Sequence, residues 1–101
     1  MYIDDSTLSI VSFGCGMSTM SSEAEIFGRA LKRWREKRGV TQEQLAHDAG
    51  ITTSYANQVE NGRKVPSLTV VLRLSLALGI LPADLLTDFT MAAMKRLRFN
   101  E

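Results

Sequence analysis

Residues 41–62 constrain the fold most, because they form two short helical patterns joined by a glycine. The segment is TQEQLAHDAGITTSYANQVENG. Leu45, Ala46 and Ala49 recur at helical spacing and give the first pattern an apolar stripe. Gly50 follows, where a residue without a Cβ ends a helix in the left-handed conformation at least cost. We therefore expect one helix to end at Ala49 and another to begin shortly after Gly50.

Polar residues at the ends of this segment suit helix caps. Thr41 with Gln44 fits a capping box, in which each side chain accepts a backbone N–H of the other residue. Thr52 can cap the second helix, and Asn61-Gly62 ends it. Two helices this short with so tight a turn are typical of a helix-turn-helix, whose second helix enters the major groove of DNA.

Similar signals predict a long helix before this segment. Ser22 with Glu25 forms a second capping box, which opens a helix that runs to Arg38 and stops at Gly39. The buried face of this helix is expected to hold Phe27, Leu31 and Trp34.

Two further helices follow the segment. Ser67 caps a fourth helix that ends before Gly79. Pro82 fits the first turn of a fifth helix, which is expected to extend as far as Leu97. The sequence thus predicts an all-α, five-helix domain with an irregular or strand-like N-terminal arm. The expected parts are an arm at 1–21, the helix-turn-helix domain at 22–89 and a C-terminal helix extension at 90–101.

The N-terminal arm leaves two alternatives open. Residues 1–21 are rich in serine and threonine, with a strand-like run at 8–13 and a glycine-containing break at 14–16. Met17 or Met20 could be the true start, which would make this stretch a mis-assigned leader. Otherwise the stretch is an arm that packs on a partner.

The order of these features resembles the Cro/repressor-type helix-turn-helix domains, also called the xenobiotic-response-element family. The resemblance covers residues 27–86, and so many landmarks at the family spacing are specific, whereas one alone would be weak. Packing of amphipathic helices explains the apolar landmarks but not Gln42, Asn61 or Pro66-Ser67. The landmarks are Phe27-Gly28, Leu31, Trp34-Arg35, Gly39-Val40-Thr41-Gln42, Leu45-Ala46, Gly50, Glu60-Asn61-Gly62, Pro66-Ser67-Leu68, Ala77-Leu78-Gly79 and Leu85-Leu86.

The resemblance also implies which residues meet DNA. Gln42 would place its side chain and backbone N–H on a phosphate at the N-terminus of its helix. Arg35 and Glu60 are expected to form a partly buried ion pair. The other phosphate-binding candidates are Asn61, Arg63 and Lys64. The outward face of the helix at residues 53–61 offers the base-reading candidates Thr53, Ser54, Tyr55, Asn57 and Gln58, while Ala56 and Val59 face the core. Gln58 suits bidentate contact with adenine.

Basic residues gather in the same part of the chain. The net charge of the whole chain is only +1. Affinity for phosphate follows the local potential rather than the overall charge. Between residues 29 and 64, four acidic residues stand against eight basic ones, namely Arg29, Lys32, Arg33, Arg35, Lys37, Arg38, Arg63 and Lys64.

Other classes of protein fit the sequence poorly. No stretch approaches the run of about 20 apolar residues that a membrane span requires, and no basic patch precedes the apolar run at 8–13 as in a secretory signal. One cysteine, Cys15, cannot form an internal disulfide, which suits a reducing cytoplasm. The single histidine, His47, has no partner for a zinc site or a catalytic triad. We expect no enzyme, no cofactor, no metal and no small-molecule ligand.

These features predict a sequence-specific transcriptional regulator whose partner is double-stranded DNA. It has no room for a separate ligand-sensing domain, and so resembles phage immunity repressors and restriction-modification controller proteins. Two alternatives stay open: an antitoxin that binds a toxin and its own operator, and a protein-interaction module that has lost DNA binding.

A homodimer is expected, because one recognition helix covers too few base pairs for useful discrimination. Its operator would be a pseudo-palindrome. The candidate interface is the N-terminal arm together with an apolar group that exceeds the needs of one small core. The alternative, that the C-terminal helix folds over Val70, Leu76 and Leu81, is compatible with a dimer. The apolar candidates are Leu76, Leu81, Phe89, Met94 and Leu97.

Overall fold

A computed structural model describes residues 22–98, which are folded into helices and turns without a strand. The all-α prediction is confirmed. The predictions for residues 1–21, including those for Cys15 and for the possible starts at Met17 and Met20, concern residues outside the described part of the chain. The described helices are α1 (Glu23–Arg38), α2 (Gln42–Ala49), α3 (Thr53–Glu60), α4 (Leu68–Leu78), α5 (Pro82–Leu85) and α6 (Met91–Lys95).

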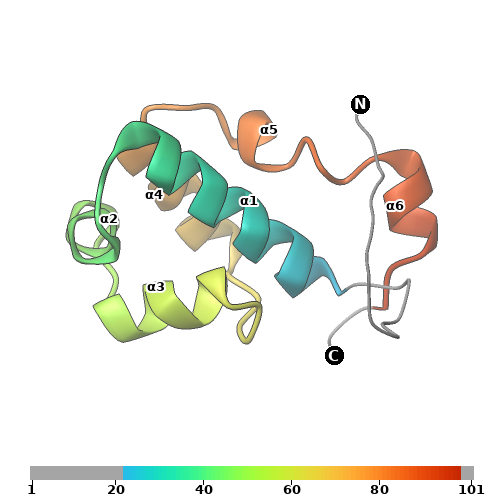
Figure 1. Cartoon of the computed structure of the whole chain (residues 1–101), viewed down its shortest axis with the longest axis horizontal. Coiled ribbons are helices and arrows are strands. Elements are labelled where there is room, and N and C mark those ends of the chain that lie inside the picture. Colours follow the sequence, from blue (N-terminus) through green and yellow to red (C-terminus); the bar gives the residue numbers. More distant parts are fainter. Residues whose placement is uncertain (1–21, 99–101) are drawn as a thin grey trace.

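The long helix α1 runs through the middle of the molecule, with α2 near one end of it and α6 beyond the other (Figure 1). It begins with the expected capping box: Ser22 Oγ accepts from Glu25 N at 3.2 Å, and Ser22 N donates to Glu25 Oε1 at 3.1 Å. It ends at Gly39, whose φ of 73° is the left-handed conformation. Helices α3, α4 and α5 all pack on α1, and α2 packs on α3 and α4.

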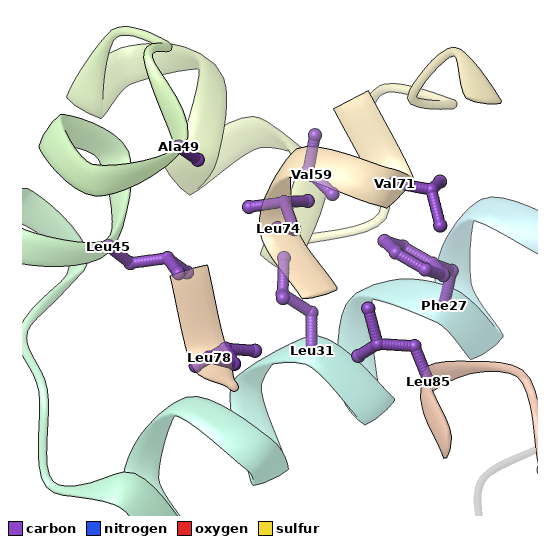
Figure 2. Packing of buried hydrophobic residues seen from close by; sticks show 9 residues of the cluster. All are labelled: Phe27, Leu31, Leu45, Ala49, Val59, Val71, Leu74, Leu78 and Leu85. Atoms are coloured by element: carbon purple, nitrogen blue, oxygen red, sulfur yellow. The ribbon is translucent and has the colours of Figure 1, made fainter. Parts of the chain in front are cut away.

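One core joins these helices (Figure 2). Leu31 of α1, Val59 of α3, Leu74 of α4 and Leu85 of α5 are completely buried, and Leu45 of α2 is 1% exposed. Burying a side chain of this size stabilises a fold by about 1.5–3 kcal/mol. The core therefore fixes the position of α3, although α3 is only two turns long.

The predicted capping box at α2 is half formed. Thr41 Oγ1 accepts from Gln44 N at 3.0 Å as expected. Gln44 Nε2, however, donates to Asp48 Oδ1 at 2.9 Å instead of the side chain turning back to Thr41. Residues four apart are neighbours on a helix surface, so Asp48 competes for this amide.

The prediction of a single fifth helix that reaches Leu97 is wrong, because the chain forms α5 and α6 separately. The Thr87 hydroxyl donates to Asp84 O at 3.1 Å just after α5 ends. Thr90 then caps α6, with its Oγ1 accepting from Ala93 N at 3.1 Å. Threonine favours such local bonds over a continuous helix.

Helix α6 does not cover the apolar group on α4 and the turn after it. It lies away from α2 and α4, at the other end of the molecule (Figure 1), and none of its residues is buried. Leu76 and Leu81 are left 82% and 68% exposed. Of the two alternatives for this group, cover by the C-terminal helix is therefore wrong for the described residues. Within residues 22–98, every helix is too short or too polar to cross a membrane.

Candidate nucleic-acid interface

The turn between α2 and α3 has the geometry of a helix-turn-helix. Gly50 ends α2 with a φ of 72°, and Ile51 N donates to Ala46 O at 2.9 Å across the turn. Thr52 then caps α3, its Oγ1 accepting from Tyr55 N at 3.0 Å. A side chain at position 50 would be strained at this φ, so glycine sets the angle at which α3 leaves α2.

Helix α3 buries one face and exposes another. Ala56 and Val59 are completely buried, as expected. The predicted base-reading residues divide between exposed and half-buried positions. Tyr55 packs against the core cluster, so its ring is partly withdrawn from solvent. Thr53, Ser54 and Asn57 are exposed, and Gln58 is half-buried.

Gly28 lets the end of α3 approach α1 closely. A Cβ at this position would lie 2.4 Å from Val59 O and 2.7 Å from Glu60 O. Both oxygens belong to the backbone, so α3 would have to move to make room. In the sequence Gly28 was only a landmark of the family resemblance; its neighbour across the fold shows why the position has no side chain.

Arg35 and Glu60 form a second link between α1 and the end of α3. Arg35 Nε donates to Glu60 Oε2 at 2.6 Å, and Nη2 donates to Oε1 at 3.2 Å. Nη1 also donates to Val40 O at 2.9 Å. The two side chains are 13% and 2% exposed. The hydrogen bond to Glu60 raises the pKa of Arg35, while burial acts in the opposite direction.

Gln42 is drawn toward the same carboxylate. Its Nε2 donates to Glu60 Oε1 at 3.0 Å, and its Oε1 accepts from Asn57 Nδ2 at 3.3 Å. The family resemblance implied a phosphate contact for Gln42. The contacts with Glu60 and Asn57 could not be predicted from the sequence, because they depend on how α2 and α3 pack. Within residues 22–98 the second N–H of the Gln42 amide forms no hydrogen bond.

The remaining phosphate-binding candidates follow α3 directly. Asn61, Arg63 and Lys64 are all exposed, and Asn61 Nδ2 donates to Asn57 Oδ1 at 3.1 Å. Arg63 N donates to Gln58 O at 2.9 Å, so the chain turns sharply at the end of the helix. Within residues 22–98 neither Arg63 nor Lys64 forms an ion pair. Their charges therefore add to the potential beside α3.

The predicted dimer residues do not form one patch. Phe89 packs against the core cluster and Leu97 is half-buried. Two further leucines, which were not predicted to take part, are exposed: Leu68 is 72% and Leu72 is 47% exposed. With Leu76 they recur every four residues and form one stripe along α4, which we call the α4 stripe.

The part of the chain that the structure describes offers no metal centre. It contains no group of three or more His, Cys, Asp or Glu side chains that could hold an ion. The ring of His47 is 85% exposed and lies 3.4 Å from Asp48 Oδ1, its neighbour on the surface of α2.

Comparison with known proteins identifies this arrangement. Residues 31–86 match the helix-turn-helix family HTH_3. The chain belongs to this family. The match confirms the resemblance to repressor-type domains, and it spans α2, the glycine turn and α3.

Relatives include proteins with regulatory names. The control protein C.BamHI of Bacillus amyloliquefaciens is 36% identical over 66 residues, 64% of this chain and 80% of that protein. The uncharacterized HTH-type transcriptional regulator YazB of Bacillus subtilis (strain 168) is 39% identical over 49 residues, 48% of this chain and 71% of YazB. The crystal structure of the restriction-modification controller protein C.AhdI from Aeromonas hydrophila is 38% identical with a TM-score of 0.61, covering 62% of this chain and 96% of that one.

Proposed function

We propose that this protein is a sequence-specific DNA-binding transcriptional regulator that places α3 in the major groove. The observation that carries the proposal is the exposed polar face of α3, held on α1 by the buried Arg35–Glu60 pair and by the close approach at Gly28. A helix held this firmly presents its side chains in one fixed arrangement, which base recognition requires. The family and the names of the relatives support the same function.

Docking and reading fall to different residues. Arg63 and Lys64 are exposed cations beyond the end of α3, where they would bind phosphates and set the register of the protein on the duplex. Thr53, Ser54 and Gln58 are polar side chains on α3, where they would meet base edges. Asn57 and Gln42 already bond to each other, which limits their freedom to read a base.

We further propose a homodimer on a pseudo-palindromic operator. A single helix of eight residues covers too few base pairs to select a site in a genome. The α4 stripe and Leu81 supply exposed apolar surface for a second copy. Such a regulator acts in the compartment that holds the DNA, which agrees with the cytoplasmic location expected from the sequence.

The test is selection of the preferred duplex from a random pool, followed by measurement of Kd on the selected and on a scrambled duplex. We expect a bipartite, inverted-repeat site that is bound at least about 1,000-fold more tightly than the scrambled one. Gln58→Ala should reduce this ratio, whereas the matched control Gln44→Ala on α2 should not. A pool that yields no preferred sequence would contradict the proposal and favour the protein-interaction alternative.

A further inference from the structure

Three carboxamide side chains form one continuous hydrogen-bonded chain that begins at Glu60. Glu60 Oε1 accepts from Gln42 Nε2 at 3.0 Å, and Gln42 Oε1 accepts from Asn57 Nδ2 at 3.3 Å. Asn57 Oδ1 in turn accepts from Asn61 Nδ2 at 3.1 Å. We call this series the amide relay. It leads from a side chain that is 2% exposed to two exposed residues at the end of α3.

The carboxylate sets the direction of the whole relay. An ionised carboxylate only accepts hydrogen bonds, so Gln42 must turn its NH₂ group toward Glu60. The carbonyl oxygen of Gln42 then faces Asn57, so Asn57 must donate from its own NH₂ group. This turns Asn57 Oδ1 toward Asn61, which must likewise donate from its NH₂ group. Reversing any one amide would bring two acceptors or two donors together, so all three orientations follow from one charge.

Arg35 holds that charge in place. Its bidentate contact and its bond to Val40 O fix the carboxylate of Glu60 against α1. Both oxygens of Glu60 accept from Arg35, and Oε1 also accepts from Gln42. The carboxylate therefore cannot rotate without losing bonds to a partly buried cation, and this rigidity extends to the first amide of the relay.

The relay leaves donors on the surface. Each amide NH₂ group has two N–H bonds, and within residues 22–98 only one N–H of each of Gln42, Asn57 and Asn61 is used. The unused N–H groups belong to the half-buried Gln42 on α2 and to the exposed Asn57 and Asn61, and the exposed cations Arg63 and Lys64 follow Asn61 closely in the chain. A phosphate oxygen accepts from such groups, whereas a reversed amide would offer it a carbonyl oxygen and repel it.

We propose that Glu60 is a positioning residue that acts through the amide relay to prealign Gln42, Asn57 and Asn61 as N–H donors to the phosphates of DNA. The inference rests on the proposed function, and it moves Asn57 from the expected base-reading group to the docking group. A glutamine or asparagine that is free to flip would donate in only part of its conformations. The relay removes this freedom before DNA binds, and so lowers the cost of ordering these side chains.

Double-mutant cycles on DNA affinity test the relay. Linked groups should be non-additive. The change in Kd for a random duplex in the double variant Asn57→Ala with Asn61→Ala should therefore differ by about three- to tenfold from the product of the changes in the two single variants. The control cycle pairs Gln58→Ala with Asn61→Ala, two residues whose side chains form no hydrogen bond with each other within residues 22–98, and should be additive within about twofold. Additivity of Asn57 with Asn61 would overturn the proposal.

A readout without DNA separates failure of the relay from failure of the proposed function. Asn57→Ala leaves Arg35–Glu60 untouched and should keep the melting temperature, yet it should shift the side-chain NH₂ signals of both Gln42 and Asn61 in ¹⁵N–¹H spectra. The NH₂ signal of Gln44, which bonds to Asp48 instead, is the internal control. Glu60→Gln, where it folds, should move the NH₂ signals of all three relay residues. If the NH₂ signals do not move, the relay is refuted whether or not the protein binds DNA. If they move but the protein binds no duplex, the DNA-binding function is refuted, and with it the role of the relay in phosphate binding.

Discussion

Arg35 on α1 and Glu60 at the end of α3 are joined by two nitrogen–oxygen contacts of 2.6 and 3.2 Å. The pair lies where α3 meets α1, and Glu60 directly follows the completely buried Val59. A second charged pair, Arg33–Asp88, is also formed from α1, at 2.9 Å, but its side chains are 57% and 38% exposed. Each pair consists of an arginine and a carboxylate, and the two pairs differ in burial.

Removal of the buried arginine should therefore cost far more stability than removal of the exposed one. Arg35→Met leaves the buried Glu60 carboxylate without its cation, and we expect a loss of about 3–5 kcal/mol. Arg33→Met is the matched control and should cost less than about 1 kcal/mol. Urea unfolding followed by circular dichroism measures both. Equal losses in the two variants would show that Arg35 does not act as a buried partner.

Gly28→Ala tests the close approach of α3 to α1. The new Cβ would meet two backbone oxygens, and we expect a loss of about 1–3 kcal/mol together with weaker DNA binding, since α3 must shift. Gly39→Ala is the control, because its Cβ would meet no atom within 4 Å and its cost would be backbone strain at a φ of +73°. Both variants should melt earlier, and only Gly28→Ala should lose affinity beyond what its unfolded fraction explains. Normal affinity of folded Gly28→Ala protein would contradict this interpretation.

Arg63→Ala should weaken binding to all duplexes by a similar factor. Arg63 is exposed and forms no ion pair in the described part of the chain, so its charge is available to a phosphate. Loss of one phosphate contact should reduce the slope of log Kd against log salt by about one unit. Titrations at several salt concentrations measure this slope. An unchanged slope would place Arg63 away from the DNA backbone.

Gln58→Ala should act on the preferred site alone. Loss of one bidentate base contact costs about 1–3 kcal/mol of discrimination, while binding to random duplexes should change little. Kd values on the selected and the scrambled site, measured at one salt concentration, provide the comparison. Equal weakening on both sites would assign Gln58 to docking rather than to reading.

Most of the fold could be predicted because its signals are local. Caps at Ser22, Thr52 and Ser67, and glycines at the ends of helices, act within one helical turn. Local signals failed after Leu85, where apolar spacing continues although Thr90 starts a new helix. Apolar spacing shows which residues can share a face, but it does not show where a threonine hydroxyl replaces a helical bond.

The candidate site divides in the same way between local and long-range signals. The family pattern supplied Arg35 with Glu60, a pair separated by 25 residues that no local rule would find. The amide relay was missed, because Gln42 and Asn57 belong to different helices and their contact depends on the angle at Gly50. Glutamine and asparagine also have several uses on a surface, so their positions in the sequence do not tell which partner they take.

The last prediction concerns oligomeric state. Leu76 and Leu81 are 82% and 68% exposed, and burying apolar area stabilises association by about 25 cal/mol per Å². A dimer with a micromolar Kd corresponds to an association free energy of about −8 kcal/mol, and we expect burial of a few such side chains per subunit to contribute to it. We expect sedimentation to show a dimer for the parent at high concentration and a monomer for Leu76→Glu combined with Leu81→Glu. Met91→Glu is the control and should remain dimeric, because Met91 is 66% exposed and belongs to α6, a helix that lies away from α4 (Figure 1). A parent that stays monomeric and binds a single half-site would rule out the dimer, whereas dissociation by Met91→Glu alone would move the interface to α6.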